Sequence, residues 1–414
     1  MAKLPTEPYK GVRDFYPEDE ALQQYLFSTM SQVVERFGYA RYDASILEPS
    51  ELYKNKGAEN EEIVNEQTYT FIDRGDREVT LRPEMTPSVA RMVAARKREL
   101  AFPLRWYSIP NVFRYERPQR GRLREHWQLN VDLFGSRSVE SGVEVIAIAH
   151  AILKAFGAKD SDFIIKLNSR SALNRAFDER GFDYDTRHNI CTLLDRKAKM
   201  PAAEFEEKLH ALAGDDVAFT QTESDDVAAT RRALAELGIT NTEFDPSIIR
   251  GFDYYTGIVF EIFDTDPQNN RSLFGGGRYD NLLSLFSDET VPAVGFGVGD
   301  VTLRDFLEVR GLLPRYTPPA RVYLAVSKAD IVSEAMKLAE ELRAGGVQTA
   351  IDFGDRKLGD QIKAADKQHI PFMIVVGEDE LASGEFTVKE LATGKEEKVS
   401  RAGLGKKLKN ESEK

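Results

Sequence analysis

Residues 126–133, HWQLNVDL, alternate strictly between polar and apolar side chains. Successive side chains of a β-strand point to opposite faces, so this pattern predicts a strand with one apolar and one polar face. The apolar face carries Trp127, Leu129, Val131 and Leu133, and the polar face carries His126, Gln128, Asn130 and Asp132. Such two-sided strands are typical of antiparallel sheets. By itself, a polar face of this kind is most often a surface in contact with water.

The segment just before this strand gives its polar face a candidate partner. Residues 112–116 form a second candidate strand that places Arg114 and Glu116 on one face, and an arginine-rich loop, RPQRGR, joins the two strands. An antiparallel pair would bring both side chains next to Gln128 and Asp132. The whole chain has a net charge of −12, yet residues 91–124 contain ten Lys and Arg against two Glu. This local excess favours an anionic ligand such as a nucleotide at one site.

The periodicity of the remaining sequence predicts several domains in 414 residues. Helices are expected at 18–38 and 139–157, with mostly strands over 68–134 and again after residue 247. The acidic, helix-rich stretch 170–246 reads as an insertion, and Pro314, Pro318 and Pro319 mark a linker. We therefore predict an α/β multidomain protein with a catalytic domain at 1–169 and 247–311, a helical insertion domain at 170–246, a linker at 312–320 and a small α/β domain at 321–414.

The cysteine content and the apolar runs limit the cellular setting. One cysteine excludes an internal disulfide framework and a cysteine-based zinc site. No apolar run approaches the length of a membrane helix, and the first residues lack the apolar region of a secretory signal. These features predict a cytoplasmic protein without a membrane partner.

Two glycine-rich clusters supply further polar groups in little space. The first, RGFDYYTG, covers 250–257, and the second, GGGRYD, covers 275–280. Glycine allows a backbone to turn tightly or to approach a ligand closely. The first cluster would equally fit a β-turn with surface aromatics. Three glycines in a row are uncommon in a structural loop, but alone they are weak evidence.

Four segments in the same order resemble the histidyl-tRNA synthetases, which are class II aminoacyl-tRNA synthetases: TLRPEMT, FRYERPQRGRLREHWQ, RGFDYYTG and GGGRYDNL. The resemblance implies a six-stranded antiparallel sheet flanked by helices, a helical insertion and a C-terminal α/β anticodon-binding domain. It implies a homodimer with the segment near Pro49 at the interface. It also implies that ATP, accompanied by Mg²⁺, activates L-histidine to an adenylate, and that the histidyl group then passes to histidine tRNA.

The resemblance also assigns roles to single residues. Arg114 and Arg250 would act on the α-phosphate as the catalytic pair. The ATP-binding residues would be Arg114, Glu116, Arg122, His126 and Arg250. The histidine-binding residues would be Glu84, Thr86, Gln128, Asp132, Tyr254 and Tyr255, with Asp132 and Tyr255 on the two imidazole nitrogens. Arg117, Gln119 and Arg120 would face the acceptor end of the tRNA, and metal ligands are not identified.

One motif departs from the family pattern. Class II enzymes usually carry Gly-Leu-Glu-Arg in motif 3, where the arginine covers the adenine, but this chain has Gly299-Asp300-Val301-Thr302. Arg304, two positions further along, would point roughly 200° away in a helix. The opposite adenine-stacking position, often Phe, is His126. We therefore expect the adenine to be held differently or more weakly.

Two other function classes share parts of this pattern. A non-catalytic histidine-sensing paralogue, such as the regulatory subunit of ATP phosphoribosyltransferase, typically lacks the anticodon domain and parts of RGFDYYTG. A nucleotide- or RNA-binding module without catalysis would leave the Arg114 and Arg250 pair without a role. The sequence contains both the candidate anticodon domain and the complete RGFDYYTG segment, which favours the synthetase.

Overall fold

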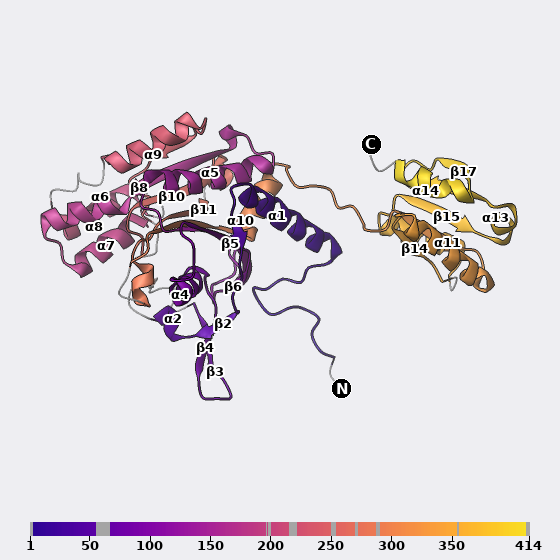
Figure 1. Cartoon of the computed structure of the whole chain (residues 1–414), viewed down its shortest axis with the longest axis horizontal. Helices are drawn as coiled ribbons and strands as arrows, with labels where there is room; N and C mark the ends of the chain where they lie inside the picture. The colour runs from indigo at the N-terminus through magenta and orange to yellow at the C-terminus, as the bar shows by residue number, and fades with distance from the viewer. Residues whose placement is uncertain are drawn as a thin grey trace. The chain divides into compact units, whose positions relative to one another are not determined.

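The structure is a computed structural model (Figure 1) that describes residues 3–54, 67–195, 197, 200–214, 222–249, 254–269, 272–286, 290–353 and 356–410. The chain divides into two compact units, Met1–Leu313 and Pro314–Lys414. Among the described residues, no helix is long and apolar enough to cross a lipid bilayer.

A large sheet organises the first unit. Its strands follow the order β1 (Ala40–Arg41), β5 (Leu104–Ser108), β7 (Glu125–Phe134), β12 (Ala293–Gly299), β11 (Ser272–Arg278), β10 (Ile258–Asp264), β8 (Phe163–Ser169) and β9 (Thr242–Phe244). The six strands from β5 to β8 are antiparallel throughout, while β1 and β9 add a parallel strand at each edge. The predicted six-stranded antiparallel sheet is therefore confirmed. Strand β6 (Asn111–Phe113) pairs antiparallel with β7 as predicted. The strand predicted at 112–116 is shorter, because it ends at Phe113 and leaves Arg114 and Glu116 in the loop that follows.

Helices cover one face of this sheet (Figure 1) and bury its apolar side chains. They are α1 (Pro17–Arg36), α5 (Val139–Ala155), α9 (Asp225–Glu236) and α10 (Asp300–Val309). Leu129 and Val131 of β7 are fully buried in this core, together with Ile148 and Ile152 of α5. The apolar face predicted for 126–133 thus faces the helices, which leaves its polar face on the other side of the sheet.

The other face of the sheet carries a smaller helix and a small sheet. Helix α4 (Thr86–Arg96) packs there with Val89 and Val93 next to Phe134. The small sheet has the order β2 (Leu47–Pro49), β4 (Glu78–Leu81) and β3 (Tyr69–Ile72), with the short helix α2 (Glu51–Lys54) after β2. The expectation of strands over most of 68–134 is wrong for α4. Pro87 in the first turn, with Ala90, Arg91 and Met92 one turn later, is a helix signal that the strand-rich surroundings conceal.

The predicted insertion contributes three helices with a core of their own. Helices α6 (Arg170–Arg180), α7 (Tyr184–Asp195) and α8 (Ala202–Ala213) pack around Phe177, Ile190 and Leu209. By contrast, Val227 and Leu234 of α9 belong to the main core beneath the sheet. The boundary at residue 246 stays a prediction, and the packing of α9 favours an independent insertion that ends earlier.

The second unit is a five-stranded sheet with helices. The strand order is β14 (Thr349–Ile351), β13 (Val322–Val326), β15 (Phe372–Val376), β16 (Glu385–Glu390) and β17 (Glu396–Ser400), of which the first three are parallel. The helices are α11 (Val332–Ala344), α12 (Leu358–Lys367), α13 (Glu378–Ser383) and α14 (Arg401–Asn410). The predicted α/β alternation is confirmed, and β17, α13 and α14 extend it.

Candidate active site

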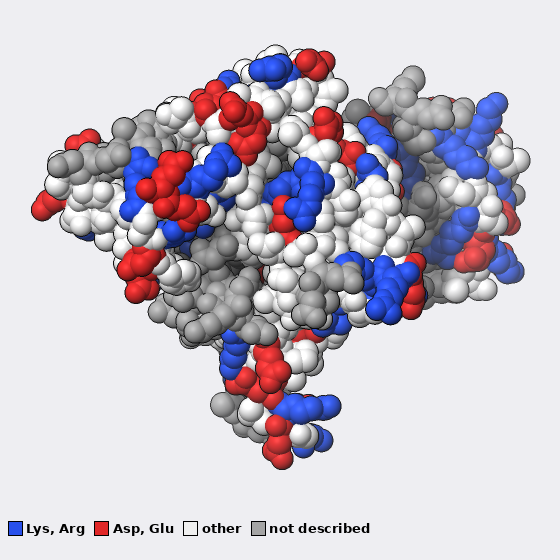
Figure 2. Space-filling model, turned by 60° about the vertical axis from the view of Figure 1, so that its left-hand side comes forward, with Lys and Arg blue, Asp and Glu red and all other residues white. Residues whose placement is uncertain are grey.

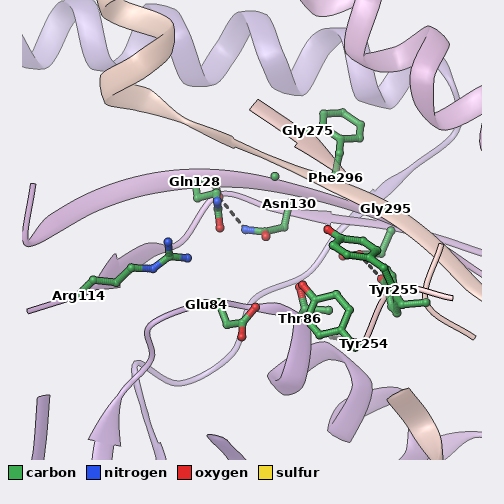
Figure 3. A pocket seen from close by; sticks show the side chains of 13 residues that line it. Glu84, Thr86, Arg114, Gln128, Asn130, Tyr254, Tyr255, Gly275, Gly295 and Phe296 are labelled. Atoms are coloured by element: carbon green, nitrogen blue, oxygen red, sulfur yellow. Dashed lines mark hydrogen bonds between the residues drawn. The ribbon is translucent and has the colours of Figure 1, made fainter. Parts of the chain in front are cut away.

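A small polar cavity of about 110 Å³ lies on the polar face of β7 (Figure 3). It is lined by Glu84, Thr86, Arg114, Gln128, Asn130, Asp132, Tyr254, Tyr255, Gly275, Tyr279, Gly295, Phe296 and Gly297. All six residues predicted to bind histidine are among them. Strand β7 supplies the amides and one carboxylate, and the turn before α4 supplies Glu84. Thr86 is the first residue of α4, and the segment before β10 supplies Tyr254 and Tyr255. The structure therefore brings together the six residues that were predicted to bind the substrate histidine.

Glycines on the neighbouring strand create the space for these side chains. A Cβ atom on Gly295 would lie 2.4 Å from Oδ1 of Asp132, and one on Gly297 would lie 2.9 Å from Nε2 of Gln128. Both contacts are closer than van der Waals distance, so any larger residue would displace the polar groups. These glycines are not among the site residues predicted from the sequence. Their signal is the GFGVG pattern of β12, which becomes meaningful only once β12 is known to pair with β7.

Asp132 presents a free acceptor oxygen. Its side chain is only 4% exposed, and the buried hydroxyl of Tyr279 donates a hydrogen bond to Oδ1. Oδ2 is buried and has no hydrogen-bond partner within the described structure. Burial raises the pKa of Asp132 from 3.8 to about 7, which the hydrogen bond from Tyr279 only partly opposes. An unpaired buried acceptor at a cavity wall is suited to a ligand N–H group.

Glu84 is the second buried carboxyl group of the small cavity, and Figure 3 shows it on the same side as Thr86 and Tyr254. Burial raises the pKa of Glu84 to about 7, while the charge of Arg114 and a hydrogen bond from Tyr254 act in the opposite direction. A cationic ligand group would restore the charged form, because an opposite charge nearby lowers a carboxyl pKa.

A larger cavity of about 300 Å³ adjoins the first. Its lining includes Arg114, Glu116, Arg122 and His126, which are the predicted ATP residues that the structure describes. It shares Arg114, Gln128, Gly275 and Gly297 with the small cavity. The guanidinium of Arg114 is held at this junction by its Nε, which donates to the carbonyl oxygen of Pro83 at 2.9 Å. Arg250, the other predicted catalytic arginine, lies outside the described residues.

The larger cavity contains both arginine and carboxylate side chains, and two of them form an ion pair. Nη1 of Arg122 lies 3.5 Å from Oε2 of Glu116, so the predicted phosphate and adenine ligands pair with each other here. His126 has a partly buried ring. Loss of hydration, followed by the charges of Arg114 and Arg13, lowers the pKa of His126 to about 3, so the ring is neutral near pH 7.

The altered motif 3 lies at the wall of the larger cavity. Thr302 lines it, and its hydroxyl donates to the carbonyl oxygen of Leu273 at 2.7 Å. Arg304 pairs instead with Asp19 of α1 at 3.0 Å. Arg304 is therefore not part of the lining of the larger cavity, in agreement with the direction expected from helix geometry.

The loop between β6 and β7 carries the residues predicted to face tRNA. Backbone hydrogen bonds in both directions join Gln119 to Arg122, at 3.0 and 2.9 Å, and make the loop a tight turn. Arg117, Gln119 and Arg120 are exposed on it, and Nε of Arg120 lies 3.5 Å from a carboxylate oxygen of Asp305. The loop therefore offers cationic and amide groups beside the larger cavity.

Several residues that line the small cavity were not predicted from the sequence. Tyr279 belongs to the GGGRYD cluster, which was noted without a role for the tyrosine, and Phe296 and the glycines of β11 and β12 carried no assignment. The signal for Tyr279 is its position, because its hydroxyl group follows closely after the three glycines of β11.

The first unit has the features of the catalytic unit of a class II aminoacyl-tRNA synthetase. These features are six antiparallel strands, a small polar cavity joined to a larger one by an arginine, and an arginine-rich loop between two of the strands. A family model described as "Histidyl-tRNA synthetase" matches residues 11–300, and one described as "Anticodon binding domain" matches 321–411. The chain belongs to the histidyl-tRNA synthetase family.

Similar proteins span the full chain. A histidine–tRNA ligase of Leptospira biflexa is 42% identical over 99% of this chain and 98% of its own length, and one of Thermoplasma volcanium is 36% identical over 96% and 97%. A crystal structure of histidyl-tRNA synthetase from Nostoc sp. PCC 7120 covers 99% of this chain and 100% of its own, with a TM-score of 0.79 and 25% identity.

Proposed function

We propose that the two joined cavities hold L-histidine and ATP side by side for adenylation. As a member of its family, the chain uses ATP to join L-histidine to tRNA, through histidyl-adenylate. The position of Arg114 is the observation that carries this assignment, because Arg114 lines both cavities. A group at this junction contacts both reactants where they meet.

Histidine would enter the small cavity with its imidazole toward Asp132. The free Oδ2 accepts one ring N–H, and the hydroxyl of Tyr255 serves the other ring nitrogen. Glu84, Thr86 and Gln128 surround the α-ammonium group. Both ends of the amino acid then satisfy buried groups that are costly to leave unpaired, so analogues without the ring nitrogens are rejected.

In the first step, a carboxylate oxygen of histidine attacks the α-phosphorus of ATP. The new O–P bond forms as the bond from the α-phosphorus to the bridging oxygen breaks, and pyrophosphate leaves. Arg114 neutralises charge on the α-phosphoryl oxygens from one side, and Arg250 is proposed for the other. In the second step, a ribose hydroxyl of the terminal adenosine of tRNA attacks the histidyl carbonyl carbon, and AMP leaves.

The larger cavity would bind the rest of the nucleotide. Arg122 would bind the outer phosphates, Glu116 would accept from the adenine amino group, and the neutral ring of His126 would stack on the base; all three residues line the cavity. Mg²⁺ would accompany ATP. No cluster of three or more metal-ligating side chains occurs among the described residues, so the cation is expected to be held mainly by phosphate oxygens, with Glu116 and Glu261 as nearby carboxylates.

Histidine tRNA would contact the protein at two places. Arg117, Gln119 and Arg120 meet its acceptor end, and the C-terminal unit reads the anticodon. Lys and Arg are interspersed with Asp and Glu over the coloured part of the face in Figure 2. Local groups of this kind, rather than one broad positive field, would select the tRNA.

The protein would act as a cytoplasmic homodimer. The small sheet near Pro49 exposes Leu47, Phe71 and Ile72, the last of which is 61% exposed. Their exposure supports the proposed interface, because a second copy placed there would remove these apolar side chains from water. The histidine-sensing alternative is disfavoured, because the chain has the anticodon-binding domain.

ATP–pyrophosphate exchange with each of the twenty amino acids tests the proposed site. Exchange with histidine alone, abolished in Arg114→Ala and Arg250→Ala, is the expected result. The control is Lys10→Ala, a substitution on the exposed surface, which should retain full exchange. Full exchange in Arg250→Ala would refute its catalytic role. Histidine binding without exchange in the unmodified protein would favour the sensor.

A further inference from the structure

The N-terminal segment of residues 9–15 packs against the back of the ATP site. The carbonyl oxygen of Gly11 accepts from the backbone N–H of Arg124 at 2.7 Å, beside the first residue of β7. Gly11 has a φ of +87°, and a Cβ atom there would lie 2.8 Å from Cγ of Arg124 and 2.9 Å from Cγ of Pro118. The segment therefore follows the base of the arginine-rich loop at a distance that only glycine permits.

Arg13 of this segment pairs with a buried carboxylate of motif 3. Its Nη2 lies 2.6 Å from Oδ2 of Asp300, whose side chain is 1% exposed, while that of Arg13 is 20% exposed. Nε2 of Gln23 in α1 donates to the same oxygen at 3.1 Å. Asp300 stands where the usual class II motif has leucine. A buried charge at that position needs a cation, and Arg13 supplies it.

The other oxygen of Asp300 holds the strand that carries His126. The backbone N–H of Trp127 donates to Oδ1 at 2.9 Å, and Phe15 of the segment packs edge-on against the Trp127 ring at 5.3 Å. His126 is the preceding residue and points into the larger cavity, whose wall also includes Thr302 of α10. Asp300 thus ties β7 to α10 at the point where both face the nucleotide.

We propose that Arg13 is a positioning residue for ATP. Through Asp300 it fixes the two walls of the adenine end of the cavity, which lacks the usual motif 3 arginine. It also neutralises a carboxylate that is buried behind the wall formed by Gly299, Val301 and Thr302, close to a polyanionic ligand. The proposal rests on the assignment of the larger cavity to ATP. It assigns to the N-terminal segment a role in nucleotide affinity and none in the recognition of histidine.

The test compares Arg13→Gln with Arg13→Lys and with Arg13→Gln/Asp300→Asn in ATP–pyrophosphate exchange. In Arg13→Gln, we expect the KM for ATP to rise roughly tenfold, because a small displacement at the site is amplified in binding and rate. The KM for histidine should stay within about twofold, since the small cavity is untouched. The charge-conserving Arg13→Lys should recover much of the loss. The double variant should recover as well, because an asparagine side chain carries no charge and its oxygen still accepts from the N–H of Trp127.

Lys10→Ala, an exposed change in the same segment, is the matched control and should leave both KM values unaltered. An unchanged KM for ATP in Arg13→Gln, an equal rise in the KM for histidine, or a double variant no better than the single one would overturn the proposal. Equilibrium dialysis with labelled ATP measures nucleotide affinity without turnover. A normal ATP affinity in Arg13→Gln there refutes the role of Arg13, whereas ATP bound without exchange by the unmodified protein refutes the enzymatic assignment instead.

Discussion

Asp132→Asn should remove activity and make the protein more stable at neutral pH. Burial holds the pKa of Asp132 at about 7 in the folded protein, against 3.8 as its ordinary value. Each pKa unit corresponds to about 1.4 kcal/mol, so the ionised carboxylate destabilises the folded state by up to about 4 kcal/mol. Asparagine carries no charge and keeps an oxygen that can accept from Tyr279.

The sign of this effect sets its pH dependence. Below pH 4 the carboxyl group is protonated in both states, and the penalty is absent. Between pH 4 and 7 the unfolded chain releases its proton first, so the unmodified protein loses stability as the pH rises. Above pH 7 the penalty is complete. The free energy of unfolding of Asp132→Asn should therefore exceed that of the unmodified protein by an amount that grows from about zero at pH 4 to about 4 kcal/mol at pH 8.

Urea denaturation at several pH values measures this difference, and ATP–pyrophosphate exchange on the same samples measures activity. We expect kcat/KM for histidine to fall at least about 100-fold, since the imidazole N–H loses its charged acceptor. Asp14→Asn, which removes an exposed carboxylate, is the control and should change stability by less than about 0.5 kcal/mol at any pH. A variant that is less stable than the unmodified protein at pH 8 would refute the argument from burial.

Three further substitutions and measurements test other parts of the site. Gly295→Ala places a Cβ atom 2.4 Å from Oδ1 of Asp132 and should raise the KM for histidine by about tenfold or more, whereas Gly359→Ala, with open space around it, should leave exchange unchanged. Glu84→Gln should raise the KM for histidine roughly 100-fold with little change in the KM for ATP, as two-substrate exchange kinetics would show, because the α-ammonium group loses its carboxylate. The pKa of His126 is lowered to about 3, so its NMR signals should not titrate between pH 5 and 8, and a titration midpoint near 6.5 would contradict the burial of the ring.

The central sheet was predictable because its pattern is local. The alternation in 126–133 separates buried Leu129 and Val131 from cavity-lining Gln128 and Asp132 without knowledge of any other strand. Helix α4 was missed, because its only distinctive start signal is Pro87 and the segments around it are strands. Local periodicity decides such short elements poorly when their packing partners are remote.

The polar residues of the site were predictable, but their supports were not. Tyr279 of the segment after β11 lies 147 positions from Asp132, Gly295 of β12 lies further still, and no local pattern links either to it. The same applies to Arg13, whose partner Asp300 is 287 positions away. A sequence pattern can name a group that contacts the substrate, whereas the group that holds it in place becomes visible only through the fold.

The distribution of charge along the two cavities would orient both substrates of the proposed site. The small cavity ends in two carboxyl groups, Glu84 and Asp132, whose pKa values are raised to about 7. The larger cavity contains Arg122, and Arg114 lies at the junction. An amino acid has its ammonium group and its carboxylate on the same carbon, so only one orientation places the cation near Glu84 and the anion near Arg114. That orientation directs the carboxylate toward the larger cavity, where the α-phosphate would lie, and reactant alignment of this kind lowers the barrier. Burial of these carboxyl groups is unfavourable for their charged forms, as their raised pKa values show. We infer that the substrate would offset this cost, because its ammonium group and its ring N–H would pair with them in the same orientation that aligns the reactants.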